Sequence, residues 1–165
     1  MKTKELDGAF HDAMRDIYYA ERQILKALPK MARAAQSEQL RQAFKTHRDE
    51  TETQKERLEK VFELLGKRPQ GKTCPAIDGI IEEGSEVMDE YKDSPALDAA
   101  LLAAAQAVEH YEIARYGTLV AWAKLLGMDE AAGILAETLE EERKTDTLLS
   151  DLAESEVNQT AVAAE

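Results

Sequence analysis

The chain has 165 residues, of which 44% are hydrophobic and 33% charged, a balance typical of soluble globular proteins. This length suits one domain spanning residues 1–165 and argues against two. Only 5% of the residues are aromatic, while Ala, Leu, Glu and Lys dominate, so the composition favours an all-α fold. A net charge of −12 argues against nucleic acid and anionic lipid surfaces as partners.

Neither secretion nor membrane insertion is indicated by the sequence. Cys74 is the one cysteine, so no intramolecular disulfide can form. The chain does not open with the charged and then apolar segment of a secretory signal. Its longest nearly apolar stretch, residues 96–108, is interrupted by Asp98 and Gln106 and is too short to span a bilayer. We therefore expect a cytoplasmic protein that does not enter membranes, and we expect Cys74 to be a free thiol.

Four segments show apolar residues at three- and four-residue steps, which predicts four long helices at about residues 4–35, 37–65, 95–126 and 129–154. Ser37 is suited to cap the start of the second helix, and Gly66 and Gly127 are suited to end the second and the third. Residues 67–94 contain prolines and a short helical segment, so they predict a crossover. The expected fold is an antiparallel four-helix bundle with a long crossover, which contains a short extra helix, between the second and third long helices. Residues beyond 154 are expected to fray.

Each long helix carries a carboxylate within its apolar stripe. Glu112 follows Glu21 by 91 residues, and Glu141 follows Glu50 by the same interval. In each predicted hairpin, Glu21 with Glu50 and Glu112 with Glu141, the two carboxylates also lie about equally far from the loop that joins their helices. Antiparallel helices rise equally per residue, so the four carboxylates should meet at one level inside the bundle. Either Glu141 or Glu142 could face inward on the fourth helix, and the 91-residue interval favours Glu141.

A ring of buried carboxylates requires neutralisation, because unpaired charges repel strongly at low dielectric. Two metal ions would supply it, and oxygen ligands with an occasional imidazole suit iron, with manganese as the alternative. His47 lies one turn before Glu50 and Glu109 one turn before Glu112, so both should point to the same region. The predicted metal-binding residues are Glu21, His47, Glu50, Glu109, Glu112 and Glu141. If the ions are redox active, oxygen or peroxide is the expected small-molecule substrate.

The same residues allow a different interpretation, in which the protein is a metal-free structural or partner-binding bundle. A buried polar layer can fix the alignment of packed helices at some cost in stability. Under this hypothesis Glu50→Leu would stabilise the fold, whereas a metal centre would lose metal and melt at a lower temperature.

Four motifs carry a resemblance to a known family: Tyr-Ala-Glu-Arg-Gln ending at Gln23, His47-x-x-Glu50-Thr51-x-x-Gln54, Val108-Glu109-His110-Tyr111-Glu112-Ile113-Ala114, and Leu139-Glu140-Glu141-Glu142. With these motifs the chain resembles the ferritin-like superfamily, and more closely the YciF-type family of bacterial stress-associated proteins. The resemblance implies a ferritin-like bundle, a homodimer, and a rubrerythrin-like metal site. One departure concerns the Glu-x-x-His motif of ferritin-like helices, because Thr53 and Lys144 occupy the histidine positions here. Ferroxidase chemistry is therefore not carried over.

Overall fold

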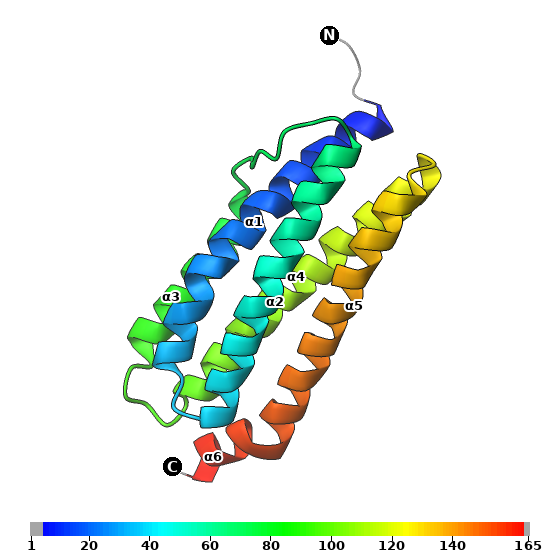
Figure 1. Ribbon diagram of the computed structural model, residues 1–165. Helices are drawn as coiled ribbons and strands as arrows, with labels where there is room; N and C mark the ends of the chain where they lie inside the picture. The colour runs from blue at the N-terminus through cyan, green and yellow to red at the C-terminus, as the bar shows by residue number, and fades with distance from the viewer. Residues whose placement is uncertain (1–4, 164–165) are drawn as a thin grey trace.

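The computed structural model describes residues 5–163, which fold into helices without any strand (Figure 1). The four long helices are α1 (Leu6–Ala34), α2 (Glu38–Leu64), α4 (Leu97–Leu125) and α5 (Asp129–Leu152). A shorter helix, α3 (Pro75–Glu90), lies between α2 and α4 in the sequence. Beyond α5 come a π-helical turn, η1 (Ala153–Val157), and the short helix α6 (Asn158–Ala163). The all-α class is confirmed.

The long helices are arranged as two antiparallel hairpins, α1 with α2 and α4 with α5 (Figure 1). The hairpins pack on each other through α2 against α5 and α1 against α4. The crossover returns along the bundle as α3, which packs on α4 and α1, so α4 runs in the same direction as α2 (Figure 1). This is the predicted four-helix bundle with a helix-containing crossover.

The ends of the helices follow from a few residues. The Ser37 side chain accepts a hydrogen bond from the Leu40 backbone N–H at 3.3 Å, which is the expected N-cap of α2. Gly66 and Gly127 adopt left-handed φ angles of 64° and 71°, which glycine reaches without a steric penalty. Asp98, buried at the start of α4, accepts hydrogen bonds from the backbone N–H groups of Gln36 and Ser37 at 2.8 and 2.6 Å. This side chain ties the α1–α2 loop to the second hairpin.

The C-terminal part differs from the prediction. Residues 153–157 do not fray but continue α5 as a π-helical turn that buries Ala153 and Val157. Two apolar side chains at this spacing bury against the end of the bundle, which offsets the cost of ordering the backbone. At the start of the second hairpin, α4 begins at Leu97, two residues later than predicted. Within residues 5–163, no helix combines the length and apolar character needed to cross a bilayer.

Candidate metal centre

Four side chains with metal-ligating atoms meet inside the bundle: His47 from α2, Glu109 and Glu112 from α4, and Glu142 from α5. All four residues are buried, and one ligand atom from each lies within 4.8 Å of the other three. The two carboxylates of α4 share a face because they are three residues apart, about one helical turn. The cluster therefore combines both hairpins of the bundle.

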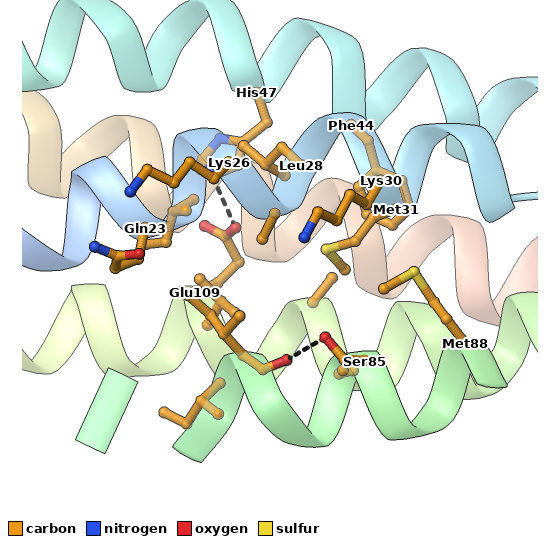
Figure 2. A pocket seen from close by; sticks show the side chains of 18 of the residues that line it. Gln23, Lys26, Leu28, Lys30, Met31, Phe44, His47, Ser85, Met88 and Glu109 are labelled. Carbon is orange, nitrogen blue, oxygen red and sulfur yellow. Dashed lines mark hydrogen bonds and ion pairs between the residues drawn. The ribbon is translucent and has the colours of Figure 1, made fainter. Parts of the chain in front are cut away.

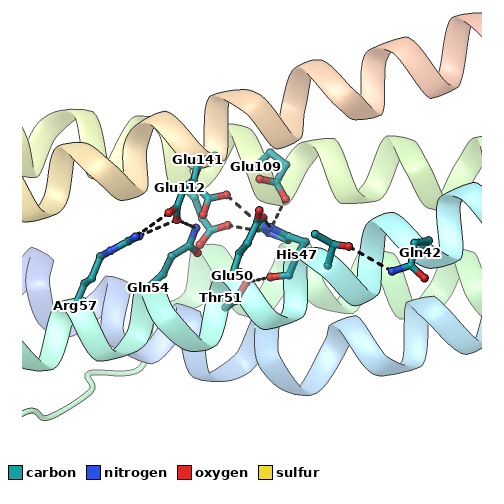
Figure 3. A network of polar contacts seen from close by, with 11 residues as sticks. Gln42, His47, Glu50, Thr51, Gln54, Arg57, Glu109, Glu112 and Glu141 are labelled. Carbon is teal, nitrogen blue, oxygen red and sulfur yellow. Dashed lines mark hydrogen bonds and ion pairs between the residues drawn. The ribbon is translucent and has the colours of Figure 1, made fainter.

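The imidazole of His47 lies at the middle of this cluster (Figure 3). Its Nε2 atom is 3.0 Å from Oε1 of Glu109, 3.7 Å from Oε2 of Glu142 and 3.9 Å from Oε2 of Glu112. The Glu109 contact is an ion pair rather than an aligned hydrogen bond, since Nε2 has no hydrogen-bond partner of acceptable geometry. The hydroxyl of Thr51 donates to the His47 carbonyl at 2.7 Å, one turn along α2.

Most polar atoms of the cluster have no hydrogen-bond partner. Both carboxylate oxygens of Glu112, both of Glu142, and Oε2 of Glu109 are buried without one. Leaving such atoms unpaired costs about 1–3 kcal/mol each, and native structures contain few of them. These unpaired oxygens around one imidazole nitrogen could hold a metal ion, and a donor set of carboxylates and one imidazole suits ions such as iron or manganese.

Burial and neighbouring charges shift the pKa values of the cluster. Burial raises the pKa of Glu112 well above its usual range, and the nearby charges of Glu142 and Glu21 add to this effect. Burial also raises the pKa of Glu142 well above its usual range and that of Glu21 to about 7. For His47, burial favours the neutral form, but the Glu109 carboxylate outweighs it and holds the pKa well above its usual range. Burial would raise the pKa of Glu109, yet His47 keeps it below its usual range.

Glu21 extends the cluster on the side of α1. Its side chain is fully buried, and its Oε1 accepts a hydrogen bond from the hydroxyl of Tyr116 on α4, which is also buried. Its other oxygen, Oε2, has no partner. Glu21 and Glu112 lie close enough for each to influence the pKa of the other.

Glu50 lies at the edge of the cluster. Its Oε2 atom is 3.5 Å from Nδ1 of His47, on the ring edge opposite Glu109 (Figure 3). The Glu50 side chain is 41% exposed. It therefore reaches the imidazole from the solvent side, and it is not a member of the buried ring that the sequence predicted.

The prediction that Glu141 faces inward is wrong. Its carboxylate binds Arg57 of α2 through two hydrogen bonds of 2.7 and 2.8 Å, and Gln54 donates a third at 3.0 Å (Figure 3). Burial would raise the pKa of Glu141, but the Arg57 guanidinium outweighs it and holds the pKa below its usual range. Glu142, the next residue, takes the inward position and is fully buried. The charge of the partly exposed Glu141 carboxylate is therefore already balanced by the Arg57 guanidinium.

Three further side chains lie around the site and were not among the predicted metal-binding residues. Arg57 and Gln54 hold Glu141 away from the cluster, and Tyr116 binds Glu21. Gln54 and Tyr116 lie on the same helical stripes as His47 and Glu112, at steps of seven and four residues, so periodicity places them nearby without showing their partners. Nothing in the sequence pairs Arg57 with Glu141, because ion pairs between helices follow from packing.

Comparison with known proteins agrees with this fold. Residues 5–162 match the family described as a domain of unknown function, DUF892. Protein YciF of Escherichia coli (strain K12) is 47% identical over 165 residues, covering 98% of each chain. The crystal structure of this E. coli protein, described as a stress protein, superposes with a TM-score of 0.89 over 96% of the present chain and 99% of its own.

Two further structures are similar. YcfI of Rhodopseudomonas palustris is 50% identical, with a TM-score of 0.88 over 90% of this chain and 95% of that one. A protein of Xanthomonas campestris pv. campestris is 22% identical and has a TM-score of 0.77 over 97% and 99% of the two chains, which shows the shared fold alone. The match of nearly the whole sequence, together with the shared bundle, shows that the chain belongs to the DUF892 family, to which the YciF-type resemblance pointed.

Proposed function

We propose that the protein is a ferritin-like metalloprotein whose bundle holds a dinuclear iron centre, with manganese as the alternative metal. The observation that carries the proposal is the buried group His47, Glu109, Glu112 and Glu142, whose ligand atoms lie within 4.8 Å of one another. Glu21 and Glu50 lie next to this group and would complete the ligands of two ions. Glu142 replaces Glu141 in the set.

The charge of the site supports two divalent ions rather than one. The carboxylates of the proposed set bring up to five negative charges to one region, and two divalent ions would balance four of them. Carboxylates that converge from the helices of a bundle are the known framework for dinuclear sites of this kind. Without metal, the same neutralisation needs protons on carboxyls that then lack hydrogen-bond acceptors in their surroundings.

Two redox-active metal ions, when bound, would supply electrons for the reduction of oxygen or peroxide. The residues of the chain would prepare the site for this reaction. His47, held by its contacts with Glu50 and Glu109, would fix one ligand position. The Tyr116 hydroxyl would orient Glu21 through its hydrogen bond. The carboxyls with raised pKa values would give up protons as cations bind.

The biological setting belongs to the same proposal. The E. coli relative is described as a stress protein, and we propose that this chain likewise acts in a bacterial stress response, in the cytoplasm and as a homodimer. A reaction that consumes peroxide or oxygen would suit that setting.

The test is metal stoichiometry with a pair of neighbouring variants. Protein purified without chelator and reloaded anaerobically with Fe(II) should bind about two ions per chain, as in other dinuclear bundles. Glu142→Gln should lower the stoichiometry to about one or less, because a ligand is lost from a closed set. Glu141→Gln is the matched control: it is the adjacent residue of α5, its carboxylate is occupied by Arg57, and its metal content should stay unchanged.

Fewer than about one metal ion per chain in the unmodified protein, with no change in Glu142→Gln, would overturn the proposal. That result would favour the metal-free bundle, in which the polar layer fixes helix alignment. Equal losses in Glu141→Gln and Glu142→Gln would show that the ligands are assigned wrongly.

A further inference from the structure

A cavity of about 160 Å³ lies beside the candidate metal centre, enclosed by residues of all four long helices and of α3 (Figure 2). Most of its wall is apolar, with Leu28 and Met31 from α1, Phe44 from α2, and Ile80 and Met88 from α3. Ligand sites for small molecules have this composition, an apolar wall with a few polar groups. An apolar cavity of about 150 Å³ in a different protein is large enough for a benzene-sized ligand.

Two lysines are among the polar residues that line the cavity. Lys26 and Lys30 lie one turn apart on α1, so their side chains extend from the same face of the helix over the cavity (Figure 2). Both lysines are exposed, and neither forms an ion pair or a hydrogen bond with any residue between 5 and 163. The chain as a whole carries a net charge of −12 and repels anions. Two unpaired ammonium groups above an apolar cavity would attract an anion locally.

We propose that this cavity binds a medium-chain fatty acid, with its carboxylate between Lys26 and Lys30 and a tail of about six carbons in the apolar part, matched to the cavity volume. The binding site does not require the metal ions. His47 and Glu109 also line the cavity, so the occupant would contact the wall of the candidate centre. Each has a buried polar atom, Nε2 and Oε2 respectively, without a hydrogen-bond partner.

The proposal predicts separate contributions from the tail and from the charge. Each methylene that enters an apolar site strengthens binding about fourfold, so heptanoate should bind the purified full-length protein much more tightly than butanoate. Heptan-1-ol has a similar tail without the charge. Calorimetric titration should show that it binds more weakly than heptanoate, because it lacks the attraction to the lysines. Both metal-loaded and metal-free protein should bind heptanoate.

Variants separate these two contributions. The double variant Lys26→Gln and Lys30→Gln should weaken heptanoate binding about three- to tenfold, a modest effect since the lysines are exposed, and leave heptan-1-ol binding unchanged. Ala104→Leu places a larger side chain in the cavity wall and should abolish binding of both ligands. Ala103→Leu is its matched control, because Ala103 is exposed and does not line the cavity. If Ala104→Leu does not fold, Ala27→Leu is the alternative variant, because Ala27 of α1 also lines the cavity.

Three results would overturn the proposal. The first is equal affinity for heptanoate and butanoate, and the second is equal loss of binding in Ala103→Leu and Ala104→Leu. The third is unchanged heptanoate affinity in the lysine double variant. The metal stoichiometry of the same preparations tests the dinuclear centre separately. Failure of fatty acid binding with two ions bound would reject the cavity proposal alone.

Discussion

Glu112→Leu should stabilise the metal-free protein and destabilise the metal-loaded one. In the structure the Glu112 side chain is fully buried, and neither of its oxygens has a hydrogen-bond partner. Burial raises its pKa well above the usual range, which favours the protonated acid in the protein interior. A leucine of similar size would remove this unsatisfied group without leaving a large cavity.

The size of the effect follows from the cost of the orphaned group. A buried polar group without a partner costs about 1–3 kcal/mol, and apolar replacements of buried ionic clusters have stabilised other proteins by about 1–4 kcal/mol. A gain of about 2 kcal/mol corresponds to a melting temperature about 4–8 °C higher for a chain of this length. Metal binding to the unmodified protein adds about 2.7 kcal/mol at a free metal concentration of 100 times Kd. Glu112→Leu should lose most of this stabilisation by metal. The variant should therefore melt above the unmodified protein without metal and below it with metal.

Scanning calorimetry of chelator-treated and of Fe(II)- or Mn(II)-loaded protein measures both terms. Glu141→Leu is the control, because its carboxylate is partly exposed and paired with Arg57, and losing an ion pair of this kind costs about 1 kcal/mol or less with or without metal. A metal-free Glu112→Leu protein that melts below the unmodified protein would refute the reasoning. It would mean that Glu112 makes favourable interactions in the absence of metal, as a structural polar layer would.

Three further outcomes are expected. Metal binding should release protons from Glu112 and Glu142, whose pKa values are raised. The heat of binding should therefore vary with the ionisation enthalpy of the buffer, and equal heats in two buffers would argue against proton release. Glu21 has a pKa of about 7 in the folded protein against 4.5 for a solvent-exposed glutamate, so its contribution to metal-free stability is full below about pH 4.5 and is lost as the pH rises through 7. Urea unfolding should show that loss between about pH 5 and 8, and Glu21→Gln should reduce it; a pH dependence that Glu21→Gln leaves unchanged would contradict the assignment. Asp98→Ala removes the acceptor of two backbone N–H groups and should lower the free energy of unfolding by about 2–4 kcal/mol, whereas an unchanged urea midpoint would show that water replaces Asp98.

The fold was predictable because its signals are local and repeated along the chain. Helix periodicity, the Ser37 cap and the glycines at 66 and 127 each act within a few residues of their own position. The crossover was predictable from prolines that interrupt the pattern. The turn after α5 was not, because Ala153 and Val157 are buried by contact with the end of the bundle, and tertiary packing of this kind leaves little trace in a short sequence.

The inward direction of each side chain was harder to predict than its height along the bundle. On α5, Leu135, Glu142 and Leu149 are buried and are spaced seven residues apart, two helical turns. This spacing selects Glu142, and it was present in the sequence. The 91-residue interval from Glu50 favours Glu141 instead, and it selects an inward residue only if Glu50 itself faces inward.

The 91-residue interval does relate equivalent positions, and for that reason it led to the wrong residue. Glu21 and Glu112, one such pair, are both fully buried. Glu50 and Glu141, the second pair, are also alike, since their side chains are 41% and 28% exposed at the rim of the cluster. The same interval relates Thr51 to Glu142, and both are fully buried. The two hairpins therefore share one geometry, in which the inward position of the second helix holds threonine in one hairpin and glutamate in the other. Thr51 offers only a hydroxyl, which donates to the His47 carbonyl, so the buried metal-ligating side chain of α2 in the cluster lies one turn earlier, at His47.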